Sequence, residues 1–446
     1  MLAIFQIIAS KARSYIFGRC FSLIMLSPRT PYTAILWLLL PYVFFHLLWR
    51  GRKQPEYFRH IPERFGFYAL SANKPVIWLH TVSVGETRAA ASLIRHLSER
   101  YPDHQLLLTH TTPTGRATSE QMYGDRVIRV YLPYDYPCAV KRFLRHFQPR
   151  IGILLETEIW FNLIHLCHTE NTPLLLLNAR LSEKSSRRYA RFSTLTRQGL
   201  RELAGIAAQT EADALRLHNL GAKEVSIMGN LKFDIEPPPA MLELGKHLRA
   251  SFGMERKIFL AASTREGEEI LILDALKKID TPHWLSVIVP RHPQRFDEVA
   301  ALIERLGFTY QRRSRNEAIR AGTQIVLGDS MGEMFAYYAA CDAAFIGGSL
   351  LPFGGQNLIE ACAVGKPVLI GPHTYNFAQA SELAVEKSAA RRVADASAMM
   401  LELQALFANP EHMQKMGSAG LQFVQSSQGA TGQALTLVNK AIGSNN

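Results

Sequence analysis

The sequence predicts an α/β protein with two doubly wound domains, each organised around a parallel sheet. Two observations support this fold class. Short apolar runs that favour strands alternate with segments of helical periodicity, which is typical of parallel sheets with crossover helices. The chain also has 446 residues, more than a single core usually holds, so two domains are expected.

The first series of strands and helices begins after residue 74. Helical spacing of apolar residues follows the first expected strand, and the alternation then continues without interruption. The expected strands are Pro75–His80, Gln105–Thr109, Val127–Leu132, Ile151–Leu155, Leu174–Asn178 and Ile206–Ala208. The later helices are expected at Gly115–Tyr123, Ala139–Phe147, Glu183–Leu203 and Glu211–Leu220.

Three consecutive prolines, Pro237–Pro239, mark the expected domain boundary, because proline continues neither a helix nor a central strand. The boundary separates an N-terminal domain, residues 54–236, from a C-terminal domain, residues 240–446. A second series of strands is expected at Ile258–Ala262, Ser286–Val289, around Tyr310, and at Gln324–Val326, Ala343–Ile346 and Pro367–Ile370.

The N-terminal region differs in composition from both domains. Residues 1–30 are expected to form an extension, and residues 31–53 a membrane anchor. Tyr32–Trp49 is mostly apolar over about 18 residues, which is close to the minimum for a span. Basic residues follow directly and place the later chain on the cytoplasmic side. Pro41 and His46 weaken a straight span, so a tilted or half-inserted helix and a buried core helix are alternatives.

The formal charge of +12 predicts a polyanionic partner, such as nucleic acid, anionic lipid or a phosphorylated substrate. No nucleic-acid-binding motif is recognised. Four cations at helical spacing face either solvent or lipid phosphates: Lys184, Arg187, Arg188 and Arg191. The five cysteines are scattered, so neither a disulfide framework nor a metal or cofactor site is expected.

Acidic residues follow two expected strands of the first domain. Glu86 in LHTVSVGE lies at a strand-to-helix turn, where it is either a helix cap or a catalytic base. The helix dipole lowers the pKa of such an acid, and a neighbouring carboxylate such as Glu156 can raise it again. Glu156 and Glu158 in LLETEIW end a very apolar strand, where acids are costly unless they are used. Lys232 in GNLKFD lies near the boundary.

Polar turns also follow strands of the second domain. A strand ends in Gly347-Gly348, and a loop leads to Asn357 and Glu360, which suggests backbone N–H groups at an anion. The alternative is a capping box formed by Asn357 and Glu360. Arg291 follows another strand and is either a ligand contact or a surface ion-pair partner. Ligands of doubly wound sheets bind at such strand ends.

These motifs together resemble a known family. The sequences HTVSVGET, LPYD, ETEIW, NARLS, GNLKFD, PRHPQRF, MGEM and GGSLLPFGGQNLIEA look like those of the 3-deoxy-D-manno-octulosonic acid (Kdo) transferases, in the same order. The resemblance implies a GT-B fold. It also implies transfer of Kdo from CMP-Kdo to the lipid A precursor, in lipopolysaccharide biosynthesis at the cytoplasmic face of a Gram-negative inner membrane.

The resemblance also implies roles for individual residues. The family's catalytic base corresponds to Glu86, and its transition-state stabilisers correspond to Glu156 and Lys232. Its CMP contacts correspond to Pro290, Arg291, Met331, Gly332, Glu333, Asn357, Leu358, Ile359 and Glu360. The resemblance implies no metal and no further cofactor.

Three other functions are consistent with parts of the sequence. The first is a membrane-associated GT-B glycosyltransferase that uses a different nucleotide sugar. The second is a basic nucleic-acid-binding protein, which the lack of a recognised motif disfavours. The third is a non-catalytic membrane scaffold, in which Glu86 would be only a helix cap.

Overall fold

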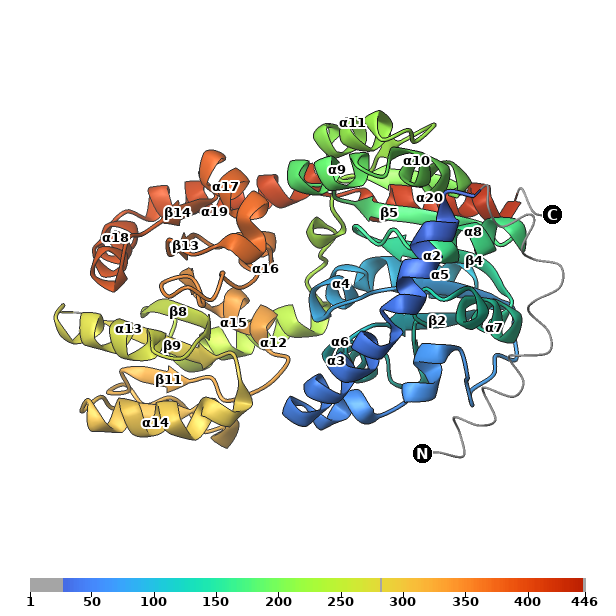
Figure 1. Cartoon of the computed structure of the whole chain (residues 1–446). Helices are drawn as coiled ribbons and strands as arrows, with labels where there is room; N and C mark the ends of the chain where they lie inside the picture. Colours follow the sequence, from blue (N-terminus) through green and yellow to red (C-terminus); the bar gives the residue numbers. More distant parts are fainter. Residues whose placement is uncertain (1–26, 281–282, 444–446) are drawn as a thin grey trace. The chain divides into compact units, whose positions relative to one another are not determined.

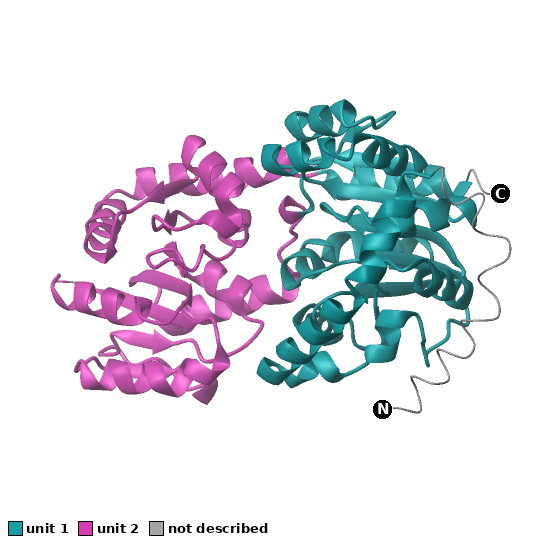
Figure 2. Ribbon diagram, in the orientation of Figure 1, with its two compact units in different colours: residues 1–231, 429–446 teal, residues 232–428 magenta. Residues whose placement is uncertain are grey.

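The computed structural model describes residues 27–280 and 283–443 (Figure 1). The chain forms two compact units (Figure 2). Unit 1 combines the chain up to Leu231 with the segment that begins at Gly429, and unit 2 is Lys232–Gln428. Most of the expected N-terminal extension lies outside the described residues.

Unit 1 contains a seven-stranded parallel sheet in the order β3-β2-β1-β4-β5-β6-β7. The strand order reverses direction between β1 and β4, as in a doubly wound fold, and this places a ligand site at the carboxyl ends of those two strands. The strands are β1 (Val76–His80), β2 (Gln105–His110), β3 (Ile128–Tyr131), β4 (Pro149–Leu155), β5 (Leu174–Ala179), β6 (Gly205–Ala208) and β7 (Ser226–Ile227).

Both faces of this sheet are buried. Val76 and Trp78 of β1 belong to one apolar core, whereas Ile77 and Leu79 belong to the core on the opposite face. Successive side chains of a strand point to opposite faces, so an almost continuously apolar strand fills both cores. The expected parallel sheet with two covered faces is therefore confirmed for this unit.

Helices and 3₁₀ turns of unit 1 connect the strands. They are α2 (Arg29–Leu38), α3 (Leu40–Lys53), η2 (Pro55–Phe58), η3 (Ile61–Phe65), α4 (Val84–Ala89), α5 (Ala91–Arg100), α6 (Pro113–Tyr123), η4 (Gly124–Arg126), α7 (Pro137–Phe147), α8 (Phe161–Thr169), α9 (Glu183–Ala190), α10 (Ser193–Glu202), α11 (Glu211–Asn219) and α20 (Ala430–Gly443).

Unit 2 contains a second seven-stranded parallel sheet in the order β10-β11-β9-β8-β12-β13-β14. Side chains of β8 again alternate between two cores, with Leu260 on one face and Phe259 on the other. The strands are β8 (Lys257–Thr264), β9 (Trp284–Pro290), β10 (Tyr310–Arg312), β11 (Ile325–Leu327), β12 (Ala343–Ile346), β13 (Val368–Ile370) and β14 (Ala390–Arg392).

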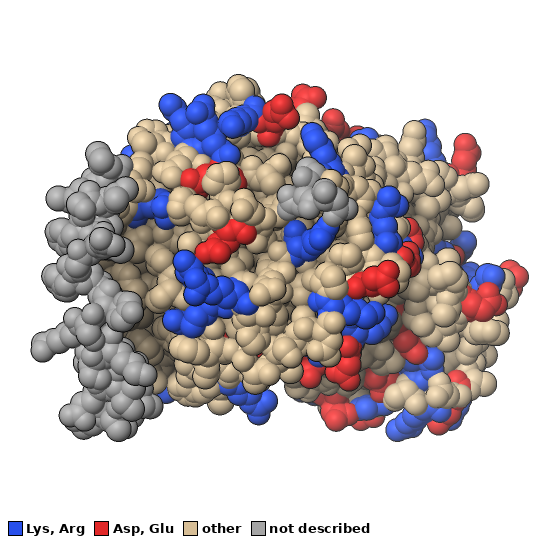
Figure 3. Space-filling view, turned by 90° about the vertical axis from the view of Figure 1, so that its right-hand side faces the viewer, with Lys and Arg blue, Asp and Glu red and all other residues tan. Residues whose placement is uncertain are grey.

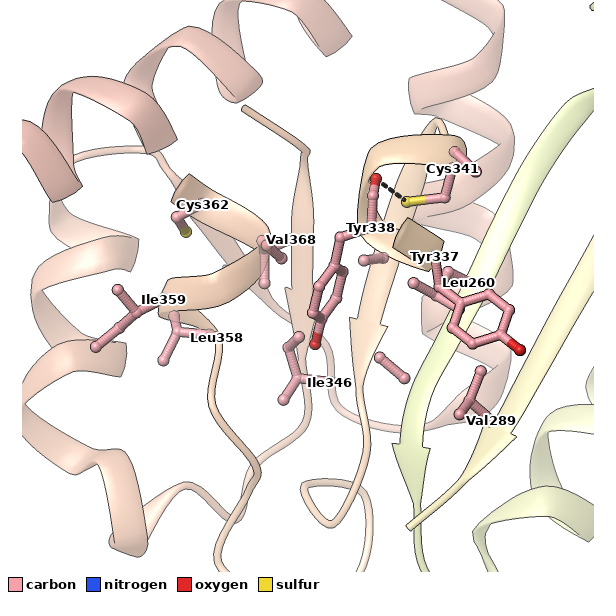
Figure 4. Close-up of a cluster of buried hydrophobic side chains, with 14 of the residues drawn as sticks. Leu260, Val289, Tyr337, Tyr338, Cys341, Ile346, Leu358, Ile359, Cys362 and Val368 are labelled. Atoms are coloured by element: carbon pink, nitrogen blue, oxygen red, sulfur yellow. Dashed lines mark hydrogen bonds between the residues drawn. The ribbon is translucent and has the colours of Figure 1, made fainter. Parts of the chain in front are cut away.

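One core of unit 2 surrounds Tyr338, whose ring lies among aliphatic side chains from several strands and helices (Figure 4). Cys341 lies in the same cluster and donates its thiol to the Tyr338 carbonyl oxygen at 3.3 Å. The helices and turns of unit 2 are α12 (Pro239–Phe252), α13 (Glu268–Lys277), η6 (Pro293–Arg295), α14 (Phe296–Arg305), η7 (Arg313–Arg315), α15 (Met334–Ala340), α16 (Ile359–Ala363), η8 (Tyr375–Phe377), α17 (Ala378–Glu386), α18 (Ala396–Ala408) and α19 (Pro410–Ser427).

The division between the units differs from the expected boundary at the prolines. The turn η5 (Leu231–Phe233) spans the division. Phe233 already packs in the core of unit 2, against the ring of Phe423 at 5.3 Å. The chain also returns to unit 1 after Gln428, because Ala434 and Val438 of α20 are fully buried in a core of unit 1. The C-terminal helix therefore does not belong with residues 240–428.

The basic helix expected at Glu183–Leu203 is two helices, α9 and α10. The carbonyl oxygen of Tyr189 accepts from the Phe192 N–H at 3.0 Å and from the Thr196 hydroxyl at 2.9 Å, which ends the regular helical ladder. All four cations of the predicted row are exposed.

The expected single anchor helix is also two helices, α2 and α3, bent by 50° at Leu39. Pro41 follows the bend at the start of α3, where the ring is tolerated but cannot extend a preceding helix. Within the described residues, neither helix alone is long and apolar enough to cross a bilayer, although the bent pair together meets the length and composition required.

We predict that Gly152→Ala destabilises unit 1. A Cβ atom at Gly152 in β4 would lie 2.5 Å from the Trp78 ring and 2.7 Å from Leu174, so these buried side chains would have to move. Overpacking of this kind costs about 1–3 kcal/mol. Urea denaturation should show the loss. Gly432→Ala, on an exposed position of α20 with open space around it, is the matched control. Equal stability of the two variants would contradict the prediction.

Candidate active site

Glu86 lies in the first turn of α4, directly after the turn that follows β1. Its backbone N–H points to the Ser83 hydroxyl oxygen, and the Ser83 hydroxyl in turn donates to Glu86 Oε1 at 2.9 Å. The Val82 N–H donates to Glu86 Oε2 at 2.7 Å. This arrangement is close to a capping box, in which a serine and a glutamate three residues later satisfy the helix start. Glu86 is therefore a helix cap, as the alternative interpretation predicted.

The same carboxyl has the properties of a general base. The pKa of Glu86 is raised to about 7, mainly by burial and to a smaller extent by the charges of Glu156 and Glu158, whereas the bonds from Val82 and Ser83 oppose the shift. The sequence analysis named Glu156 as a cause but missed burial, which is the larger one. A base with a pKa near the working pH is efficient because it is partly ionised and still accepts protons readily.

Glu156 and Glu158 follow β4 at the same edge of the sheet. Glu156 has a φ of +60°, in the left-handed region that non-glycine residues seldom adopt. Its N–H donates to the Leu177 carbonyl oxygen at 3.1 Å, which holds this conformation. Glu158 Oε2 accepts from the Trp160 indole N–H at 2.6 Å, and burial raises the pKa of Glu158. Such backbone strain concentrates at functional sites.

Lys232 belongs to η5, at the start of unit 2. Its Nζ atom lies 5.7 Å from the centre of the Phe377 ring. The preceding residue, Leu231, is held in unit 1, where its N–H donates to the Asn178 Oδ1 atom at 3.1 Å. Asn178 also has a left-handed φ, of +54°, at the end of β5. The NARLS motif thus fixes the point at which the chain leaves unit 1.

Pro290 ends β9 in unit 2, and Arg291 follows it. The Arg291 N–H donates to the Thr264 carbonyl oxygen at 2.9 Å, and its Nε atom donates to Gln356 Oε1 at 3.2 Å. These bonds join the ends of β8 and β9 to the glycine-rich loop. The predicted turns at Arg291 and at the glycine-rich loop therefore do come together at one edge of this sheet.

Met331, Gly332 and Glu333 form the turn before α15. Met331 is half exposed and Gly332 has a φ of +82°. Glu333 accepts from Arg313 Nη2 at 3.2 Å and from the Ser330 hydroxyl at 2.6 Å. Arg313 is a neighbour of this site that the sequence analysis did not identify, because it lies in a loop with no recognisable motif.

The glycine-rich loop does bind an anion through its backbone, but that anion is a side chain of the protein. The Glu268 carboxylate accepts from the N–H groups of Gly348 at 2.5 Å, Leu350 at 2.9 Å and Arg265 at 2.8 Å. Gly347 is needed for the close strand approach, since a Cβ atom there would lie 2.4 Å from the Ser263 carbonyl oxygen. Glu268 thus orders the loop from within, and the sequence analysis missed this role.

The segment from Asn357 to Glu360 begins α16. Asn357 Oδ1 accepts from the Ile359 N–H, and Asn357 Nδ2 donates to Glu360 Oε1, both at 3.1 Å. These bonds link the two side chains at the start of α16, but the N-cap of this helix is Leu358 and no side chain caps it, so the predicted capping box is not formed. The side chains of Leu358 and Ile359 are buried in the apolar core (Figure 4). Only their backbone groups are thus suited to contact a ligand.

The described residues 27–280 and 283–443 contain no group of three histidine, cysteine or acidic side chains arranged to hold a metal ion. The candidate residues of unit 1 are buried carboxylates, and those of unit 2 are cations, amides and backbone N–H groups.

We predict that Glu86→Gln stabilises the fold at alkaline pH. Between pH 4.5 and pH 7 the unfolded glutamate has lost its proton while the folded one retains it, so stability falls as the pH rises through this window. Glutamine does not ionise, so the stability of the variant does not fall in this way as the pH rises. Each pKa unit corresponds to about 1.4 kcal/mol. The free energy of unfolding of the variant should therefore exceed that of the wild type by on the order of 3 kcal/mol at pH 8.5 and should equal it at pH 4. Urea denaturation at both pH values measures the difference, and a pH-independent difference would contradict it.

Comparisons with known proteins show the family of this chain. A family model for 3-deoxy-D-manno-octulosonic-acid transferases (Kdo transferases) matches residues 59–235. The 3-deoxy-D-manno-octulosonic acid transferase of Bordetella pertussis is 40% identical over 433 residues, 93% of this chain and 100% of the relative. That of Haemophilus influenzae is 36% identical over 414 residues, 91% and 97% of the two chains.

A solved structure shows the same fold at low sequence identity. The UDP-GlcNAc 2-epimerase of Neisseria meningitidis has a TM-score of 0.55 and 16% identity, and the match covers 82% of this chain and 100% of that one. This likeness supports the two parallel-sheet α/β domains alone. Sequence identity across nearly the whole chain carries the functional conclusion: the chain belongs to the 3-deoxy-D-manno-octulosonic acid transferase family and is a glycosyltransferase that transfers Kdo in lipopolysaccharide biosynthesis.

Proposed function

We propose that this enzyme transfers Kdo from CMP-Kdo to the lipid A precursor, with Glu86 as the general base. A sugar hydroxyl is a weak nucleophile, so a carboxylate must accept its proton as the new glycosidic bond forms. Burial raises the pKa of Glu86 to about 7, and this observation carries the proposal. A carboxylate in contact with water, with its ordinary pKa, would be a poorer acceptor.

The donor is assigned to unit 2. Arg291, Lys232 and the backbone N–H groups at the start of α16 would stabilise the phosphate of the departing CMP. Pro290, the turn of Met331, Gly332 and Glu333, and the segment from Asn357 to Glu360 are the proposed nucleotide contacts. We assign Glu156 and Lys232 to transition-state stabilisation. Direct attack on the donor gives a single displacement with inversion, and the proposed mechanism is independent of metal.

In the proposed GT-B fold, the two doubly wound domains bind acceptor and donor separately. Acceptor binding is assigned to unit 1 because the proposed base lies there.

We predict that Glu86→Gln abolishes transfer while CMP-Kdo still binds. Glutamine preserves the size of the side chain and its place at the helix start, but it cannot accept the proton. Loss of a general base lowers the rate by about 10²–10⁴-fold. Mass spectrometry of the product formed from CMP-Kdo and the lipid A precursor measures transfer, and calorimetry measures donor binding.

Glu99→Gln, at an exposed position of α5, is the matched control and should retain full activity. A parallel incubation with UDP-sugars tests the alternative donor class. Full transfer by Glu86→Gln would reduce Glu86 to a helix cap. Transfer from a UDP-sugar in place of CMP-Kdo would overturn the donor assignment.

We also propose that α2 and α3 attach the enzyme to the inner membrane from the cytoplasmic side. Leu38, Tyr42 and Phe45 are 80%, 62% and 69% exposed, which is unusual for large apolar side chains close together in a chain. The last turn of α3 is basic, with Arg50, Arg52 and Lys53. Apolar side chains beside cations are typical of an interfacial helix on an anionic membrane.

One side of the α2–α3 pair packs against the rest of unit 1. The Tyr32 hydroxyl donates to the buried Asp135 at 2.8 Å, and the Thr33 hydroxyl donates to Asn162 at 2.9 Å. In α3, the Phe44 ring stacks on Phe65 at 5.3 Å. A pair held to the domain in this way favours attachment in the plane of the membrane over a full span, because polar domain surface does not enter hydrocarbon.

The positive charge of the chain suits the same surface chemistry. Figure 3 shows several separate groups of lysine and arginine side chains on one face, with uncharged and acidic side chains between them. The cations on this face and the net charge of +12 would add to attraction by anionic lipid.

We predict that Leu38→Glu combined with Phe45→Glu releases the enzyme from vesicles. Each substitution places a charge where apolar surface would enter the membrane. Flotation with vesicles that contain anionic lipid measures binding. Leu215→Glu, at an exposed leucine of α11, is the control and should stay bound. Binding unchanged by the double substitution would exclude α2 and α3 as the attachment surface.

A further inference from the structure

A buried polar layer lies behind the carboxylates of unit 1. His80, the last residue of β1, is fully buried, and so are Thr109 and His110 of the neighbouring strand β2. Polar side chains are costly in such a place unless each finds a partner. The partners of His80 therefore define what this histidine does.

The hydrogen bonds of His80 fix its tautomer. Its Nδ1 atom lies 3.0 Å from the Thr109 carbonyl oxygen and 2.9 Å from the Thr109 hydroxyl oxygen. A carbonyl oxygen only accepts, so Nδ1 carries the hydrogen. The Trp78 indole N–H also donates to this hydroxyl at 2.8 Å. In the neutral ring, Nε2 is left with a lone pair and no hydrogen.

This lone pair faces the acidic site. Nε2 is buried without a hydrogen-bond partner, and the Glu158 Oε2 atom lies 3.9 Å away. If Glu158 were ionised, its Oε2 atom and the His80 Nε2 atom would both be hydrogen-bond acceptors, and no hydrogen bond could form between them. A protonated Glu158 would instead have an acceptor for its O–H, once a small side-chain movement closes the distance. The geometry thus favours the acid form of Glu158.

We propose that His80 is a positioning residue that holds Glu158 in its protonated form and thereby keeps Glu86 available as an anionic base. This inference rests on the proposed role of Glu86. The proton stays on Glu158 throughout turnover, with its O–H directed at His80 Nε2. Removing one negative charge from the site favours the ionised form of its remaining carboxyls.

The surrounding titratable groups are consistent with this arrangement. Burial lowers the pKa of His80 to about 3, with the neighbouring His110 contributing, so the ring is neutral at physiological pH. Burial raises the pKa of Glu158, the hydrogen bond from the Trp160 indole N–H opposes this shift, and the charge of Glu156 adds to it, so that the pKa is raised overall. Tyr189 of α9 also interacts with Glu158. Glu86 responds to the charges of both Glu156 and Glu158.

The test replaces the acceptor atom His80 Nε2 with a hydrogen-bond donor. In His80→Gln, an amide N–H₂ replaces the lone pair and donates to an ionised Glu158. The midpoint of the acidic limb of kcat/KM against pH should then rise by at least about 0.5 unit, because an ionised Glu158 makes Glu86 harder to deprotonate. Adding Glu158→Gln to His80→Gln should return the midpoint toward that of Glu158→Gln alone.

His110→Gln supplies the matched control, a buried histidine on β2 whose Nδ1 bonds to the Thr81 carbonyl oxygen, and its midpoint should not move. An unshifted midpoint in His80→Gln, or a shift that persists without an ionisable Glu158, would overturn the proposal. Activity retained by Glu86→Gln would instead refute the underlying role of Glu86, so the two failures are distinct.

A measurement on the wild-type protein is independent of variant folding. Nitrogen-15 NMR of the histidine side chains at pH 7 should show His80 neutral, with its hydrogen on Nδ1 and Nε2 bare. A hydrogen on His80 Nε2, in either a neutral or a charged ring, would also overturn the proposal.

Discussion

Both sheets of this protein are buried on two faces, and this constraint determines where polar chemistry is possible. A parallel strand such as β1 contributes side chains to opposite cores at every step, so a charge within its length would be unsatisfied. Polar groups can therefore concentrate only where strands end. Glu86, Glu156 and His80 in unit 1 and Arg291 in unit 2 all lie at such ends. The site is a consequence of how the core is built.

The constraint also explains how the proposed base, Glu86, is at the same time a helix cap. Glu86 completes the start of a short helix, and the bonds that it accepts there fix its orientation. Burial at the same position raises its pKa into the range of a working base. Capping and catalysis are compatible because the first requires oxygen atoms in fixed places, whereas the second requires a poorly solvated carboxylate. A glutamate on an exposed helix would meet only the first requirement.

Much of the fold and the outline of the site followed from the sequence. Apolar runs predicted most strands, because their periodicity and length are local properties, and the motifs predicted which strand ends hold the proposed site residues. Properties that depend on packing did not follow. The residues next to Glu86 in the sequence do not reveal that it is buried. The residues next to Glu268 do not reveal that its carboxylate accepts hydrogen bonds from N–H groups of the glycine-rich loop.

The helix break between α9 and α10 and the bend between α2 and α3 were missed for a related reason. The spacing of the cations predicted one helix across the first site, and the apolar run predicted one anchor across the second, although Pro41 already indicated that a straight span is disfavoured. The α9–α10 break depends on a carbonyl that accepts from Phe192 and Thr196. Backbone hydrogen bonds of this kind leave no signature in hydropathy.

The return of α20 to unit 1 has a consequence for the order in which the protein can fold during synthesis. Unit 2 is continuous in the chain, so all its strands are available once Gln428 has left the ribosome. Unit 1 starts earlier yet ends last, because Ala434 and Val438 complete one of its cores. The apolar side chains that pack against α20 therefore stay uncovered until α20 has been synthesised. A nascent chain that stalls before α20 would expose these side chains to chaperones and proteases.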